Sequence, residues 1–232
     1  ISERKNGKDG AAACSSAGGC PSWQKLEGVL ALVRRVAVTG GLSCGKSSVC
    51  RILQECGART ISADQIVHQL LSSDPLVIDQ VVSLFGDAVL EKGQISRRQV
   101  RERVSRDFRS LTALENILHP AVYRVIQREA QEVVSLGQAS FFVAEVPLLF
   151  ESRGELLFET TVAVISPVSQ AKKRFFEQFG EDEEDFAWRS DRQMALLEKA
   201  KRADFVLLNS RDLPYLRGLV KELYGELCRN DL

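Results

Sequence analysis

Residues 36–48 read VAVTGGLSCGKSS, and this short stretch decides what kind of fold to expect. Gly40, Gly45, Lys46 and Ser47 fit the pattern G-x-x-x-x-G-K-[ST] in every position. The residues before the loop are apolar and β-branched, and the apolar residues after it recur at helical spacing. The stretch therefore predicts a strand, a glycine-rich turn and a helix, which is the context in which this pattern binds phosphate.

A loop of this kind presents successive backbone N–H groups, backed by the positive end of the helix dipole, to an anion. The expected occupant is a nucleoside triphosphate. Lys46 would reach its outer phosphates, and the Ser47 hydroxyl would hold Mg²⁺. The predicted nucleotide-binding residues of the loop are Gly41, Leu42, Ser43, Cys44, Gly45, Lys46, Ser47 and Ser48.

The composition excludes several classes of partner. The 232 residues include 31 basic and 31 acidic side chains, so no net field attracts nucleic acid or an anionic membrane surface. No apolar run approaches the roughly 20 residues that cross a bilayer. We expect a soluble protein that binds neither nucleic acid nor membrane.

Six cysteines occur without zinc or disulfide spacing, and one of them, Cys44, lies in the phosphate loop. This usage favours a reducing cytoplasm. The position of Cys44 at a helix N-terminus could make its thiol reactive, although a small loop residue is the simpler interpretation.

Apolar runs and helical patterns alternate along the chain. Residues 1–33 are expected to form a mostly flexible tail, because the first 22 are rich in Gly, Ala and Ser without periodicity. Five strands are predicted, at 36–38, 58–62, 141–149, 160–166 and 203–209. Their alternation with helices predicts an α/β fold, a parallel five-stranded sheet with helices on both faces.

The rest of the chain divides into the core and two helical regions. The predicted core comprises 34–63, 138–168 and 202–232. Residues 64–137 should be mainly helical, with their last helix starting behind His119-Pro120. Residues 168–200 are expected to form a highly charged helical pair, interrupted at Gly180. Residues 169–201 would then act as a mobile lid over the triphosphate.

Two carboxylates follow or end predicted strands. Asp64 comes directly after the second strand, where it could orient or deprotonate an attacking hydroxyl, but it could equally cap the following helix. Glu145 lies in an apolar strand, where an unpaired charge is costly. It therefore implies either Mg²⁺ or a structural ion pair.

Basic side chains gather in both helical regions. Guanidinium groups suit phosphates, yet charge runs are more often solvated helix faces, and both interpretations stay open. One group is Arg97, Arg98, Arg101, Arg103, Arg106 and Arg109. The other, in the expected lid, is Lys172, Lys173, Arg174, Arg189 and Arg192. His68 and His119 are the only histidines, and their separation suggests no metal pair.

Taken in order, these motifs resemble the dephospho-coenzyme A kinase family. The resemblance runs from about residue 34 to 226. It rests on VAVTGGLSCGKSSV, GARTISADQIVHQLL, ISRRQVRERV, LENILHPAV, VPLLFE and RQMALLEKAKRADFVLLN. Many nucleotide-binding proteins share the phosphate loop alone, whereas the whole ordered series is far more specific.

The resemblance implies a nucleotide kinase-like fold and transfer of the ATP γ-phosphate to the ribose 3′-hydroxyl of dephospho-coenzyme A. It implies that Asp64 is the catalytic acid-base residue, that Gly45, Lys46 and Ser47 bind ATP and Mg²⁺, and that Arg174 and Arg189 belong to the lid. We also predict that Lys46 is catalytic, that Arg174 and Arg189 contact ATP, and that Glu145, from its place in the strand, holds Mg²⁺ together with Ser47. The region 64–137 matches the coenzyme-binding part, with Arg97 and His119 as its substrate-binding residues.

The sequence also departs from the family pattern. Ser43 and Cys44 replace the usual Gly-Ser of the loop, and Ser48 replaces Thr, which backbone binding should tolerate. Gln178 stands where the family usually has a second lid arginine, and only Lys173 or Arg192 could supply the missing charge. Two alternatives remain: another nucleoside or nucleotide kinase, and a nucleotide-binding module without catalysis. The oligomeric state stays open.

Overall fold

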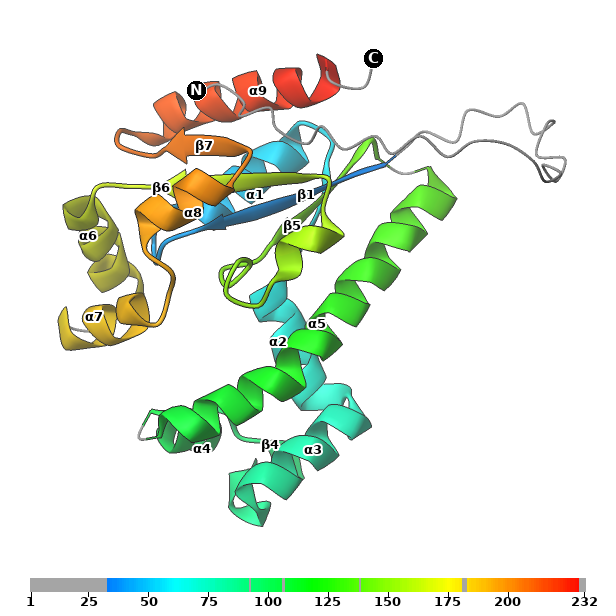
Figure 1. The fold of residues 1–232 in the computed structure, drawn as a ribbon, viewed down its shortest axis with the longest axis vertical. Coiled ribbons are helices and arrows are strands. Elements are labelled where there is room, and N and C mark those ends of the chain that lie inside the picture. The colour runs from blue at the N-terminus through cyan, green and yellow to red at the C-terminus, as the bar shows by residue number, and fades with distance from the viewer. Residues whose placement is uncertain (1–32, 92, 106, 138, 181–182, 230–232) are drawn as a thin grey trace, which may run out of the picture.

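The computed structural model describes residues 33–91, 93–105, 107–137, 139–180 and 183–229 (Figure 1). The predicted N-terminal tail, apart from Val33, lies outside these residues, as does Arg106. None of the helices in the described ranges combines the length and the apolar character that crossing a membrane requires.

A five-stranded parallel sheet forms the centre of the molecule. Its strands are β1 (Arg34–Gly40), β2 (Arg59–Ser62), β5 (Phe141–Glu145), β6 (Thr160–Ile165) and β7 (Phe205–Leu208). They lie in the order β2-β5-β1-β6-β7, and every neighbouring pair is parallel. The predicted parallel sheet is confirmed, and its five strands fall within or overlap the predicted runs.

The register of the sheet brings the carboxyl ends of β1, β2 and β5 together. Glu145, the last residue of β5, pairs with Val38 on one side and with Ser62 on the other. The strand is shorter than predicted, because the chain leaves the sheet after Glu145, and Pro147 has no N–H for a further ladder bond. The phosphate loop, Glu145 and the start of the helix after β2 therefore lie at one edge.

Helices cover both faces of the sheet, as predicted. Val36, Val38 and Val143 face a core shared with α1 (Lys46–Glu55) and α9 (Leu213–Arg229). Ala37 and Ala144 face the opposite core, which includes residues of the long helix α5 (Phe108–Leu136). Alternate residues of each strand thus point into different cores, as the pleat of a doubly covered strand requires.

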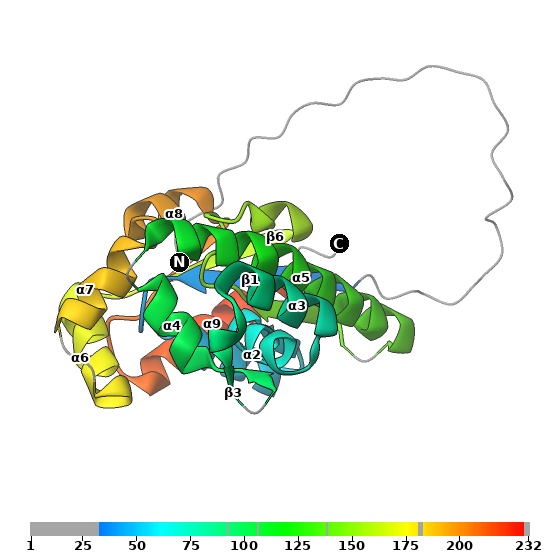
Figure 2. The same ribbon diagram turned by 90° about the horizontal axis from the view of Figure 1, so that it is seen from below.

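The region 64–137 gathers on one side of the sheet, below it in Figure 1 and nearest the viewer in Figure 2. Besides α5 it contains α2 (Ala63–Ser73), α3 (Pro75–Phe85), a 3₁₀ turn η1 (Asp87–Val89) and α4 (Arg97–Val104). A small hairpin, β3 (Leu90–Glu91) with β4 (Gln94–Ile95), interrupts the helices. The sequence did not predict it, since strands of two residues are too short to show an alternating pattern.

Helix α5 does not start behind His119-Pro120, and that prediction was wrong. The helix begins at Phe108, where the Asp107 carboxylate accepts hydrogen bonds from the N–H groups of Arg109 and Ser110. Pro120 lies inside the helix, and the ribbon bends part-way along α5 in Figure 1. An interior proline removes one backbone hydrogen bond, and packing of the apolar residues on both sides of it outweighs that loss.

The predicted helical pair at 168–200 is three helices. Gly180, with φ of +63°, ends α6 (Val168–Phe179), and α7 (Glu183–Asp191) and α8 (Leu196–Arg202) follow. Helices α6 and α7 lie together at the left of Figure 1, whereas α8 packs on β1 and β6. A further 3₁₀ turn, η2 (Gly154–Leu157), lies between β5 and β6.

Candidate active site

The phosphate loop depends on two glycines with positive φ. Gly40 ends β1 with φ of +144°, and Gly45, the N-cap residue directly before helix α1, has φ of +98°. A Cβ on Gly40 would lie 2.0 Å from the Val164 carbonyl oxygen. These are the two glycines of the sequence pattern. The pattern therefore requires glycine at both positions because the backbone there has a positive φ that residues with a Cβ rarely adopt.

A side chain from the opposite end of the sequence braces this loop. Asn209, buried directly after β7, donates from Nδ2 to the Cys44 carbonyl at 2.9 Å. Its own backbone carbonyl accepts a bond from the Ser166 hydroxyl at 2.8 Å, and Arg174 donates to that hydroxyl at 3.1 Å. Arg174 of helix α6 is thereby connected to the loop through two buried polar residues, Ser166 and Asn209.

Lys46 lies within the loop that it is expected to serve. Its side chain is 8% exposed, and Nζ donates to the Gly41 carbonyl at 2.8 Å. An ammonium group carries three donor hydrogens and can contact a phosphate from this position. The loop therefore holds its own cation beside the backbone N–H groups at the start of α1.

Glu145 contacts the next residue of the loop. The Ser47 hydroxyl donates to Glu145 Oε1 at 2.9 Å. Burial raises the pKa of Glu145, and the neighbouring Asp64 carboxylate raises it further, whereas the Ser47 hydrogen bond and Lys46 lower it. A cation bound at this position would offset the cost of placing two carboxylates close together.

Asp64 does not cap helix α2, so the capping interpretation of this residue was wrong. Ser62 is the N-cap residue, and Asp64 lies in the first helical turn with its side chain exposed. The acid is free to face the space in front of the phosphate loop. It also lies near enough to Glu145 to affect the pKa of that group.

These groups surround one cavity of about 750 Å³ at the carboxyl edge of the sheet. The cavity brings together many of the predicted site residues, namely Leu42, Ser43, Gly45, Lys46, Ser47, Ser48, Asp64, Glu145, Arg174 and Arg189. Gly41 and Cys44 line a smaller neighbouring cavity of about 80 Å³. Arg97, on α4, and His119, on α5, line neither of them.

The structure does not support a reactive Cys44. Its side chain is 1% exposed, and burial raises the pKa of its thiol. The thiolate that would react is thus disfavoured at neutral pH. Cys44 is a small buried residue of the loop, as the simpler interpretation held.

Several residues of the cavity were not predicted as site residues. They are Glu115, Pro147, Leu148, Glu177, Gln178, Phe179, Arg192 and Gln193. Arg192 had a signal, since it was one of two possible replacements for a lid arginine, and Lys173 does not line the cavity. No sequence pattern indicated Glu115, because it lies far in sequence from the other cavity residues. The same holds for Asn209, which contacts the phosphate loop from outside the cavity lining.

Comparison with known proteins identifies the family. The model of the family described as dephospho-CoA kinase matches residues 34–214. The chain belongs to the dephospho-CoA kinase family. A dephospho-CoA kinase of Protochlamydia amoebophila is 50% identical over 196 residues, which cover 84% of this chain and 97% of the relative. One from Aquifex aeolicus is 33% identical over 85% of this chain and 100% of its own length.

Solved structures confirm the fold of this family member. A dephospho-CoA kinase from Campylobacter jejuni matches with a TM-score of 0.64 and 28% identity, covering 85% of this chain and 98% of its own. The Thermus thermophilus protein TT1252 matches with a TM-score of 0.71 and 29% identity over 84% of this chain and 98% of its own. The fold is therefore the phosphate-loop kinase fold that the sequence predicted.

Proposed function

We propose that this chain transfers the γ-phosphate of ATP to the ribose 3′-hydroxyl of dephospho-coenzyme A, giving coenzyme A and ADP, the last step of coenzyme A biosynthesis. The chain belongs to the dephospho-CoA kinase family, and one observation of its structure supports the proposal. Lys46 and Ser47 of the phosphate loop, Asp64 after β2 and Glu145 at the end of β5 line a single cavity together with Arg174 of the lid.

Each group has a role that its position supports. Lys46 and the loop N–H groups would bind the β- and γ-phosphates and offset the charge that develops on them. The exposed Asp64 carboxylate would accept the proton of the acceptor hydroxyl or orient that hydroxyl. Arg174 and Arg189 would close over the nucleotide and help to exclude water.

Mg²⁺ fits the oxygen donors that meet beside the loop. The Ser47 hydroxyl and the Glu145 carboxylate are hydrogen-bonded to each other, and Asp64 lies near them. Hydroxyl and carboxylate oxygens are ligands that Mg²⁺ accepts, with phosphate oxygens and water completing its shell. The ion would neutralise the phosphates, and we assign Ser47 and Glu145 to holding it.

The coenzyme would occupy the region 64–137. Arg97 and His119 stay predictions for its binding, since both belong to that region but lie outside the cavity. A cytoplasmic location is also part of the proposal. The described cysteines are free thiols, which agrees with a reducing compartment.

An ADP-release assay tests the acceptor. Purified protein with ATP and Mg²⁺ is offered dephospho-coenzyme A, adenosine, nucleoside monophosphates and pantetheine derivatives in parallel. We expect turnover with dephospho-coenzyme A and formation of coenzyme A in equal amount to ADP. A preference for a nucleoside or a nucleoside monophosphate would instead indicate the alternative kinase, and ATP binding without turnover would indicate a binding module.

Replacement of Asp64 tests its role in the reaction. Asp64→Ala should lower kcat by about 10²- to 10⁴-fold, because it removes the group that accepts or orients the hydroxyl proton. The dissociation constant for ATP, measured by titration, should change little. Asp79→Ala, on helix α3 and outside the cavity, is the matched control. Unchanged turnover in Asp64→Ala would refute the assignment.

A further inference from the structure

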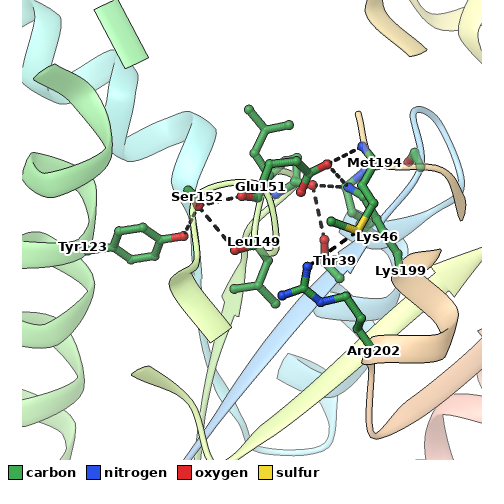
Figure 3. Close-up of polar contacts among 12 residues, drawn as sticks. Thr39, Lys46, Tyr123, Leu149, Glu151, Ser152, Met194, Lys199 and Arg202 are labelled. Carbon is green, nitrogen blue, oxygen red and sulfur yellow. Dashed lines mark hydrogen bonds and ion pairs between the residues drawn. The ribbon is translucent and has the colours of Figure 1, made fainter. Parts of the chain in front are cut away.

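A buried lysine lies behind the phosphate loop. Lys199 of helix α8 has a side chain that is 0% exposed, yet it carries an ammonium group (Figure 3). Nζ donates to the Pro147 carbonyl at 2.6 Å and forms an ion pair with Glu151 Oε1 at 3.0 Å. Burying a charge in this way is costly, and apolar residues of similar volume can replace such a pair without loss of stability.

The Pro147 carbonyl is held from two sides. Besides Lys199, the Thr39 hydroxyl donates to it at 3.2 Å. Thr39 directly precedes the first glycine of the phosphate loop, and Pro147 lies two residues after Glu145 and lines the cavity. The two bonds together hold the chain that leaves β5, the Thr39 bond relative to the end of β1 and the Lys199 bond relative to α8.

The Glu151 carboxylate fixes a third segment. Glu151 Oε1 also accepts the backbone N–H of Met194 at 2.7 Å, as Figure 3 shows. Met194 follows Arg192 and Gln193, which line the cavity and lie in the segment between α7 and α8. The other oxygen, Oε2, is buried and has no hydrogen-bond partner among the described residues. Lys199 therefore supplies the positive charge that is paired with this carboxylate.

We propose that Lys199 and Glu151 form a positioning pair that holds the exit of β5 and the return of the lid in place around the phosphate loop. Neither residue of the pair lines the cavity. It acts through the Pro147 carbonyl on Glu145, and through the Met194 amide on the cavity-lining residues before it. The inference rests on the proposed function, since it assigns a purpose to groups around that same site.

The test compares kcat with KM in three variants, which are Lys199→Met, Glu151→Gln and the variant that combines both substitutions. Lys199→Met should lower kcat about 30-fold, because small displacements of reacting groups are costly. KM for dephospho-coenzyme A should stay within about twofold, because neither Lys199 nor Glu151 lines the cavity. KM for ATP should rise in step with the loss of Mg²⁺-dependent nucleotide affinity, because Glu145 is displaced. Lys201→Met is the matched control, since Lys201 lies on the same helix and its side chain is 66% exposed.

The combined variant separates positioning from folding. With both charges removed, it should unfold at a temperature close to that of the wild type even if Lys199→Met is unstable. Its kcat should stay low, because neither the Pro147 carbonyl nor the Met194 amide regains a charged partner. A combined variant that is folded and turns over like the wild type would overturn the proposal and leave the pair a purely structural feature.

A measurement of nucleotide binding tests the positioning pair without the acceptor substrate. The dissociation constant of a fluorescent ADP analogue is measured with and without Mg²⁺. Affinity without Mg²⁺ should match the wild type in Lys199→Met, whereas the gain in affinity on adding Mg²⁺ should fall about tenfold, because Glu145 is displaced. An unchanged gain would contradict the inference. Failure of the wild type to phosphorylate dephospho-coenzyme A would contradict only the proposed function.

Discussion

Gly40 shows how strongly one position constrains the phosphate loop. Its φ of +144° is one that L side chains rarely adopt, and a Cβ there would lie 2.0 Å from the Val164 carbonyl oxygen of the neighbouring strand. Gly40→Ala should therefore lower the free energy of unfolding by about 2–4 kcal/mol, through backbone strain and displacement of β6. Urea unfolding followed by circular dichroism measures the change.

Gly218 provides the opposite control. It lies inside helix α9, and a Cβ there would meet no heavy atom within 4 Å. Gly218→Ala should raise the free energy of unfolding by about 0.5–1 kcal/mol, because alanine loses less backbone entropy in a helix. Equal effects of the two substitutions would show that the strain argued for Gly40 is absent.

For single residues, the sequence predicts site residues that belong to a local motif. It does not predict residues whose partners lie far away in the sequence. Lys46 and Ser47 were predicted from a local pattern, and they line the cavity. Asn209 braces the same loop from 165 positions away, which no spacing rule reveals. Asp64 could be a cap or a site residue until Ser62 was seen to occupy the N-cap position.

The sequence predicts helices and strands well where a periodic pattern is long. It predicts their ends poorly where a tertiary contact determines the boundary. The five strands and their parallel order follow from apolar runs between helices. The start of α5 depends instead on the Asp107 cap, and its continuation through Pro120 depends on packing along 29 residues. Proline is a strong local signal, and here the apolar core outweighs it.

Helix α5 also carries a half-buried histidine that should make stability depend on pH. Burial lowers the pKa of His119, although Glu115 and Glu151 oppose that shift. The unfolded chain therefore binds a proton more readily than the folded one, so stability falls as pH drops through the ordinary histidine value of about 6.5 toward the lower folded value. His119→Asn should lose less stability than the wild type between about pH 7.5 and 5.5.

Gln69→Asn on α2 is the control, because it replaces an exposed residue without removing a titratable group and should retain the wild-type pH dependence. Thermal unfolding across the pH range measures both variants. Parallel curves for the wild type and His119→Asn would exclude the predicted contribution of this histidine.

In the whole molecule, the cavity joins three parts of the chain: the sheet edge, helices α6 and α7 with the residues that follow them, and the helical region 64–137. The chain directly after α7 meets α5 where Arg192 Nη2 lies 3.4 Å from Glu115 Oε1. The Arg192 guanidinium also lies 4.4 Å from the centre of the Trp188 ring. Such a contact could not be predicted from the sequence, since it depends on how the regions pack around the sheet.

This arrangement distinguishes the two candidates for the charge missing at Gln178. Arg192 lines the cavity, whereas Lys173 is exposed and forms a helical pair with Glu177 at 3.9 Å. Arg192→Met should lower kcat/KM for ATP about 30-fold, as expected when a cation at the transferring phosphate is lost. Lys173→Met should change it by less than about twofold, since exposed ion pairs contribute little.

Glu115→Gln shows whether the charge of Arg192 or its contact with α5 matters. This variant keeps a hydrogen-bond acceptor for the guanidinium and removes only the opposing charge, so activity should stay within about threefold of the wild type. Steady-state kinetics with varied ATP at saturating dephospho-coenzyme A measures all three variants. If Glu115→Gln lost as much activity as Arg192→Met, the bridge between lid and α5 would be the essential feature, and Arg192 would act by closing the cavity rather than by contacting phosphate.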